Sequence, residues 1–271
     1  MANPVLTPQR IGEAADEFEP GWALGAQTAG GARTDASGAI QPPGPGVRTM
    51  TAGGTFAKTF ILWAIVVAAA SVAWSQTKIP AFGTVRFPGW IWIALFAGLG
   101  LALLTIFKPK LAPVTAPLYA VAEGVFLGAI SKIYNSQWNG IALEAVLATA
   151  AVFLICLFLF SSGIVKVTKK FTFVVIAATA GIMVMYLAGF LLNLFGADIT
   201  FWNSPSPLGI GVSVVICVVA ALNLFLDFEM IRQLSFANAP KQMEWYGAFG
   251  LTVTMVWLYL EILRLLSKLR S

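Results

Sequence analysis

Hydrophobic residues dominate seven stretches of the chain, and short segments rich in Pro, Gly, Lys, Ser and Asn separate them. None of the stretches alternates apolar and polar residues with the period of two that a barrel strand requires. Each is near the length that crosses a hydrocarbon core of about 30 Å at about 1.5 Å per residue. The pattern predicts transmembrane helices at about 57–75, 89–107, 115–134, 140–160, 171–195, 208–231 and 245–267.

The connections between these stretches determine how the helices are arranged. Segments such as KPKLAP and NSQWN are too short to cross the bundle, so consecutive helices should be antiparallel neighbours. Trp74, Trp90 and Trp202 lie near stretch ends, which is typical of the aromatic belt at a membrane interface. The predicted fold is therefore an all-α integral membrane protein, a bundle of seven transmembrane helices over residues 51–271.

The first 50 residues have a different composition. The segment GAQTAGGARTDASGAIQPPGPG is rich in Gly, Ala and Pro and has few residues able to build a core. No apolar run follows a basic start, so this segment does not read as a signal peptide. Residues 1–50 are predicted to form a disordered N-terminal tail.

Composition supports a membrane location and argues against several functions. The chain is 58% hydrophobic and 11% charged, whereas soluble domains are about a quarter charged. Its net charge of +5 comes from basic residues that lie mostly between the apolar stretches, which suits lipid headgroups. No basic run is interleaved with exposed aromatic residues, so nucleic acid is not an expected partner.

Metal and enzyme motifs are also missing from the sequence. The chain has no His, and its two cysteines, Cys156 and Cys217, fall inside apolar stretches, so neither a zinc site nor a disulfide framework is expected. No nucleotide-binding glycine loop occurs. An aspartyl intramembrane protease would need two embedded aspartates, and only Asp227 is embedded. We therefore expect a protein that is not an enzyme and has no firm metal site.

Loop charges predict the orientation. Lys and Arg are more numerous on the flanks that share the side of the N-terminus, which predicts a cytoplasmic N-terminus. Arg264, Lys268 and Arg270 at the C-terminus oppose this orientation. A seventh stretch that re-enters the membrane or lies tilted would remove the conflict.

The third stretch carries small residues at every fourth position, which allow helix backbones to approach closely. These residues are Ala116, Ala120, Gly124 and Gly128. Glu123 lies beside this stripe and has two interpretations. It is either a carboxylate near the inner interface, within reach of Lys108 or Lys110, or a member of a polar pathway.

Each of the last two apolar stretches carries an acidic residue away from its boundary, Asp227 in LNLFLDFEMI and Glu261 in VWLYLEILRLL. A charge at the bilayer centre costs at least about 3 kcal/mol, so embedded acids are candidates for a function. Asn223 precedes Asp227 by one turn on the same face, and Arg232 follows it. Asp227 either pairs with Arg232 or a lysine, or it is a protonatable gate or cation ligand.

The last stretch places its polar residues on one face. Thr254, Glu261 and Lys268 recur every seven residues, and Arg264 follows Glu261 by three. Glu261 and Arg264 could therefore form a local ion pair. Glu229 and Glu244, at the inner boundary, are expected to be solvated.

The segments EGVFLGAISKIY, ALNLFLDFEMI and LYLEILRLL resemble the Bax inhibitor-1 family, in its bacterial branch, over about residues 50–270. The resemblance implies six helices around a central seventh and a place in the bacterial cytoplasmic (inner) membrane. It also implies a cation leak, with calcium as the permeant or regulatory ion, and a role in stress responses. Bacterial members also include modulators of membrane proteases.

The family's leak is thought to be gated by a pair of acids on the last two helices, which the resemblance carries over to Asp227 and Glu261. The two acids are 34 residues apart in this chain, which is more than the spacing that the family pattern has. If both helices are straight and turn near residues 234–242, Asp227 lies about 10 Å from the turn and Glu261 about 28 Å. A helix break could bring Glu261 closer, Glu123 could be the partner, or Asp227 has no acidic partner.

Two functional hypotheses follow from the sequence. The first is a pH-sensitive cation leak gated around Asp227, with Glu261, Glu123 and Asn223 as further candidates for the pathway. The second is a non-conducting protein that binds and restrains another membrane protein, such as a protease. Both expect the lipid bilayer as a partner, and neither predicts an oligomeric state or a cofactor beyond calcium.

Overall fold

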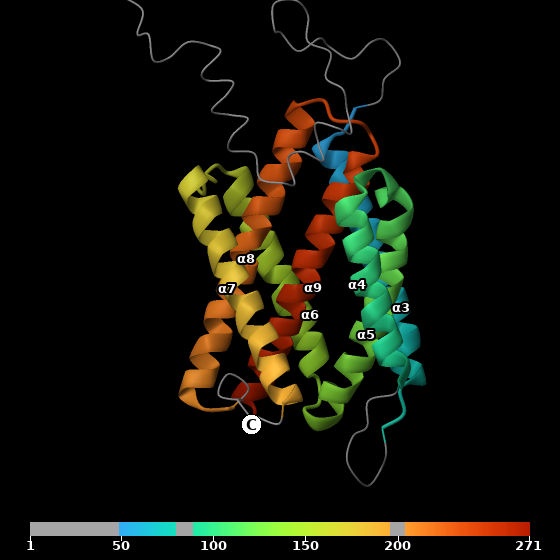
Figure 1. The fold of residues 1–271 in the computed structure, drawn as a ribbon, viewed down its shortest axis with the longest axis vertical. Helices are drawn as coiled ribbons and strands as arrows, with labels where there is room; N and C mark the ends of the chain where they lie inside the picture. The colour runs from blue at the N-terminus through green and yellow to red at the C-terminus, as the bar shows by residue number, and fades with distance from the viewer. Residues whose placement is uncertain (1–48, 80–88, 196–203) are drawn as a thin grey trace, which may run out of the picture.

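A computed structural model describes residues 49–79, 89–195 and 204–271, so residues 1–48 of the predicted tail lie outside the described ranges. The described residues confirm the all-α class, with seven helices long and apolar enough to cross a membrane (Figure 1). These helices, with one short 3-10 turn, are α3 (Ala52–Gln76), α4 (Gly89–Phe107), η1 (Pro109–Leu111), α5 (Ala112–Gln137), α6 (Ile141–Ser161), α7 (Lys169–Leu194), α8 (Pro207–Phe236) and α9 (Met243–Leu269).

Helix caps explain why several helices begin earlier than the apolar stretches. The Thr51 side chain accepts a hydrogen bond from the Gly54 N–H at 3.0 Å, so α3 begins at Ala52 although Gly53 and Gly54 are poor helix formers. Ser206 caps α8 in the same way, and Pro207 occupies its first turn. Apolarity shows which part of a helix lies in lipid, whereas capping decides where the helix begins.

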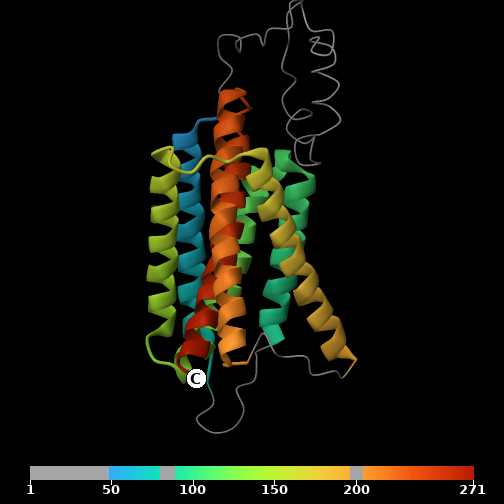
Figure 2. The ribbon, with the colours of Figure 1, turned by 90° about the vertical axis from the view of Figure 1, so that its left-hand side faces the viewer.

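The helix α9 lies largely inside the bundle. It packs against α3, α5, α6 and α8, and its buried residues run from Met243 to Lys268. Figures 1 and 2 show it running between the two sides of the molecule. The helices α4 and α7 are peripheral: α4 packs on α5, α7 packs on α8, and Figure 2 shows the lower end of α7 leaning away from the bundle.

The last helix is continuous over its 27 residues, so the re-entrant or broken seventh segment considered from the sequence is wrong. The basic residues that suggested it have partners inside the protein. Arg264 pairs with Glu261 at 3.0 Å, and Lys268 donates to the Gly209 carbonyl at 3.1 Å and to the Ser213 hydroxyl at 2.6 Å. Counting Lys and Arg in the loops includes these residues as indicators of orientation, although they bind polar groups inside the bundle.

The stripe of small residues on α5 packs against α3. A Cβ atom on Gly124 would lie 2.5 Å from the Val66 carbonyl oxygen, and one on Gly128 would collide with the Ala70 backbone. Ala116 and Ala120 are fully buried. The two backbones therefore approach closely, which is the usual role of small residues in membrane helices.

Candidate functional site

Asp227 lies within the membrane-spanning part of α8 and faces α9. It precedes Phe236, the last residue of α8, by nine residues, or about 14 Å. The Thr254 hydroxyl on α9 hydrogen-bonds to its carboxyl group. A Cβ atom on Gly250 would lie 3.6 Å from Asp227 Oδ1, so α9 presents a glycine and a threonine here. Residues 250 and 254, and not Glu261, therefore lie at the depth of Asp227 on α9.

One oxygen of the Asp227 carboxyl group has no hydrogen-bond partner within the described ranges. Oδ2 is buried and accepts no hydrogen bond from any residue that the structure describes. Arg232 donates instead to Glu229 Oε1 at 2.9 Å, so the predicted pairing of Asp227 with Arg232 is wrong. Glu229 and Arg232 are three residues apart and share a helix face, whereas Asp227 is five residues from Arg232 and points elsewhere. Asp227 therefore has one hydroxyl partner and no counter-charge among the described residues.

Asn223, one turn before Asp227, bonds to a different helix. Its Nδ2 donates to Thr179 Oγ1 on α7 at 2.8 Å and to the Val219 carbonyl at 2.9 Å. The two polar residues thus share one side of α8, but Asn223 joins α8 to α7 while Asp227 faces α9. The hydrogen bonds of the described residues do not join Asn223 to Asp227.

Glu261 is occupied by other partners. Its side chain is 2% exposed, its Oε2 lies 3.0 Å from Arg264 Nη1, and its Oε1 accepts from the Tyr186 hydroxyl at 2.9 Å. The local ion pair expected from the sequence is therefore confirmed, with a tyrosine of α7 added to it. Glu261 follows Thr254 by seven residues, or about 10 Å along a continuous helix. The structure thus separates the two acids of the last two helices.

Glu123 faces α4. Its carboxyl group lies beside the Tyr119 hydroxyl, and a Cβ atom on Gly98 of α4 would lie 3.0 Å from its Oε1. The Tyr119 ring packs edge-on against Phe249 of α9, with 5.1 Å between ring centroids. No ion pair within the described ranges joins Glu123 to Lys108 or Lys110. In the structure, neither Glu123 nor Glu261 faces Asp227.

Glu244 is a buried acid that the sequence interpretation missed, because it was expected to be solvated. It is fully buried, and its Oε1 accepts from the Thr51 N–H and hydroxyl at 3.0 Å each and from Lys241 at 2.7 Å. Its Oε2 pairs with Lys58 of α3. Glu244 lies in the first turn of α9, where the helix dipole favours an acid. That position was the one signal that the sequence offered.

The Glu244 cluster also fixes the segment before α3. Thr49 forms an isolated antiparallel bridge with Pro240, and the Met50 N–H donates to the Ala239 carbonyl at 2.7 Å. Residues 49 and 50, which the sequence assigned to the tail, are therefore held against the α8–α9 connection. The cluster joins the start of α3 to the start of α9.

Among the described residues, Asp227 is a single carboxyl group and not part of a cluster of metal ligands. Within the described residues, no group of three or more His, Cys, Asp or Glu side chains could hold a metal ion. A buried carboxyl without a counter-charge is accommodated by taking up a proton or by binding a cation. Asp227 can therefore exchange a proton or give one oxygen to a passing cation.

The family model described as Bax inhibitor 1 like matches residues 3–271, which include the seven helices and nearly all of the N-terminal tail. No curated protein matches the chain.

Proposed function

The chain belongs to the Bax inhibitor 1-like family, and we propose that it is a pH-sensitive cation leak pathway gated around Asp227. The observation that carries this proposal is the buried, unpartnered Oδ2 of Asp227 between α8 and α9. Calcium is the proposed permeant ion, as the family resemblance implies. The proposed activity is transport without an enzymatic reaction.

The contacts of Asp227 suggest how such a gate would work. A protonated carboxyl can remain in the α8–α9 contact, where Thr254 is its one hydrogen-bond partner among the described residues. A charged carboxylate there would need water or a cation, because no basic side chain of the described residues pairs with it. Loss of the proton would thus favour opening of this contact, while Glu261 stays paired with Arg264. In this proposal one acid gates the pathway, and no acidic pair is needed.

Calcium flux into proteoliposomes that hold a calcium-sensitive dye tests the proposal. We expect the wild-type chain to pass calcium above the level of empty liposomes and Asp227→Asn to change that flux several-fold. Glu144→Gln is the matched control, because it removes a carboxylate whose side chain is 49% exposed and which pairs with Arg270. Equal flux in the wild type, Asp227→Asn and empty liposomes would rule out the leak.

For location, we propose the bacterial cytoplasmic membrane with the N-terminus in the cytoplasm, where the family resemblance implies a role in stress responses. Lys108, Lys166 and Lys170 lie in or beside the connections on the same side as the start of α3, which supports this orientation. A cysteine placed at Ser162, in the α6–α7 connection, should react with a membrane-impermeant thiol reagent only from the cytoplasmic side.

A second candidate function is a non-conducting protein that binds another membrane protein, such as a protease. The peripheral position of α7 favours it, because Phe173 and Phe190 are exposed on this helix, which leans away from the bundle (Figure 2). A photo-crosslinking residue at Phe190 should then capture the same partner in wild type and in Asp227→Asn. Failure to capture a partner from intact membranes would count against this candidate.

A further inference from the structure

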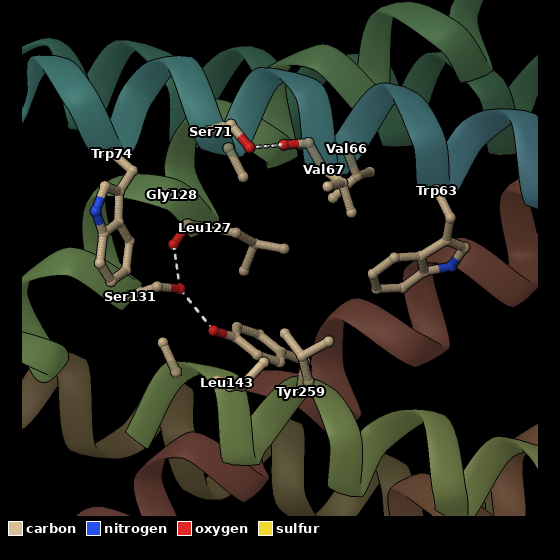
Figure 3. A pocket seen from close by; sticks show the side chains of 13 residues that line it. Trp63, Val66, Val67, Ser71, Trp74, Leu127, Gly128, Ser131, Leu143 and Tyr259 are labelled. Carbon is tan, nitrogen blue, oxygen red and sulfur yellow. Dashed lines mark hydrogen bonds between the residues drawn. The ribbon is translucent and has the colours of Figure 1, made fainter. Parts of the chain in front are cut away.

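A cavity of about 430 Å³ lies between α3, α5, α6 and α9, and none of its lining residues belongs to α8, the helix of Asp227 (Figure 3). Its volume is within the range of about 300–1,000 Å³ that small-molecule sites have. Its walls are mostly apolar and include Trp63, Val67, Trp74, Leu143, Val146 and Tyr259. Nothing in the proposed leak uses this cavity.

The cavity is a groove that opens toward lipid. Val67, Leu143 and Val146 line it and are 54%, 64% and 47% exposed. In a bundle of membrane-spanning helices, outward-facing apolar residues at this depth contact hydrocarbon. The groove therefore meets the acyl chains of the bilayer directly.

The length of the groove corresponds to one leaflet. Trp63, near the middle of α3, and Trp74, near its C-terminal end, lie at opposite ends of the groove (Figure 3). Eleven residues of helix separate them, or about 16 Å, which is about half of a 30 Å hydrocarbon core. A single acyl chain that extends from the interface to the bilayer midplane has the same reach.

The hydroxyl groups of the groove have no proton left for a polar ligand. Ser71 donates to the Val67 carbonyl at 2.8 Å, and Ser131 donates to the Leu127 carbonyl at 2.5 Å (Figure 3). Ser131 must then accept the hydrogen bond that joins it to the Tyr259 hydroxyl at 2.6 Å, so the tyrosine proton is also used. Trp63 Nε1 has no hydrogen-bond partner among the described residues, but it lies on the side of its ring that faces away from the other lining residues (Figure 3). The hydroxyl groups and apolar side chains of the wall thus favour a hydrocarbon chain over a hydrogen-bonding ligand.

The interfacial end of the groove is basic. Lys132 Nζ lies 4.9 Å from the centroid of the Trp74 ring, and Lys78 follows the end of α3 by two residues. No carboxylate of the described residues forms an ion pair with either lysine. Lysines at this position attract anionic lipid headgroups.

We propose that the groove binds one anionic phospholipid of the leaflet on the side of the α3 C-terminus. One acyl chain would lie between Trp63 and Trp74, and the phosphate would lie at Lys132. Tyr259 belongs to α9, so the bound chain would touch the helix that also carries Thr254. This lipid site does not depend on the proposed leak.

Photo-labelling in proteoliposomes tests the site. The probe is phosphatidylglycerol that carries a diazirine on one acyl chain, compared with phosphatidylcholine that carries the same chain. We expect mass spectrometry to find the label concentrated on peptides around Val67 and Val146, with several-fold more from phosphatidylglycerol. Val146→Trp should lower this labelling several-fold, because the indole fills the groove.

Two matched controls keep the test specific. Val72→Trp adds the same indole to a residue of α3 that is 62% exposed and outside the groove lining, so labelling should not change. Lys132→Gln should abolish the preference for phosphatidylglycerol, whereas Lys170→Gln, at the opposite end of the bundle, should preserve it. Label spread evenly over all lipid-facing helices, or unchanged by Val146→Trp, would overturn the proposal. So would equal labelling by the two lipids, or crosslinks at the groove to a second copy of the chain.

Discussion

Asp227 and Glu244 are two buried acids at the α8–α9 pair, and their surroundings are opposite. Glu244 accepts hydrogen bonds from Thr51 and pairs with Lys58 and Lys241, so each of its oxygens has a partner. Asp227 has the Thr254 hydroxyl, a glycine beside it and one oxygen with no described partner. Burial alone therefore does not mark a functional acid. The acid whose charge is balanced joins helices, and the acid whose charge is not balanced is the one to which we assign the proposed gate.

The largest expected effect comes from removing the charge of the balanced acid. Glu244→Gln would leave Lys58 and Lys241 without a partner, and breaking a buried ion pair costs about 3–5 kcal/mol. Because the Lys241 side chain is 45% exposed, we expect the lower end, about 3 kcal/mol, in the free energy of unfolding. Asp227→Asn should change this free energy by less than about 1 kcal/mol, since no ion pair is lost. Denaturant titration in detergent measures the free energy of unfolding of both variants. Equal losses in the two variants would contradict the difference between the two acids.

Two glycines provide a matched steric test of the same two acids. A Cβ atom on Gly54 would collide with the Glu244 carboxylate, whereas one on Gly250 would make ordinary contact with Asp227 Oδ1 at 3.6 Å. Gly54→Ala should therefore cost about 1–3 kcal/mol through overpacking. Gly250→Ala should be neutral or stabilising by up to about 1 kcal/mol, because alanine is the better helix former. Thermal unfolding of the two variants, side by side, checks the difference in sign.

The two lysines of Glu244 should differ in importance. The side chain of Lys58 is 17% exposed and that of Lys241 is 45% exposed, so solvent screens the second pair more strongly. We expect Lys58→Met to lower stability by about 1–2 kcal/mol and Lys241→Met by less than about 1 kcal/mol. Added salt should weaken the contribution of Lys241 more than that of Lys58. Double-mutant cycles with Glu244→Gln measure how strongly each lysine is coupled to Glu244. A larger coupling energy for Lys241 than for Lys58 would contradict this assignment.

A small effect on stability should come from Thr254→Val, which removes the hydrogen bond that Asp227 receives and nearly keeps the shape of the side chain. We expect a loss of about 1 kcal/mol or less. The same substitution should clearly change the calcium flux, because the Asp227 carboxyl group would lose its one described hydrogen-bond partner. A flux unchanged by Thr254→Val, in a protein that conducts, would show that the contact with α9 does not control the pathway.

The sequence predicted those features that depend on local pattern. Apolar length located the seven helices, the three-residue spacing predicted the Glu261–Arg264 pair, and the rise per residue gave Asp227 and Glu261 different depths in straight helices. The Glu244 cluster was missed because its partners Thr51 and Lys58 are far away in the chain and come close only when α3 packs beside α9. Tyr186 of α7, a partner of Glu261, was missed for the same reason.

The measurement that tests the central claim most directly is calcium flux into proteoliposomes as a function of pH, for the wild type and Asp227→Asn in parallel. The asparagine keeps the shape of the side chain but cannot exchange a proton at this position. We predict that the wild-type flux changes with pH and that the flux of Asp227→Asn does not. A pH dependence that persists unchanged in Asp227→Asn would contradict the assignment of the gate to this carboxyl group.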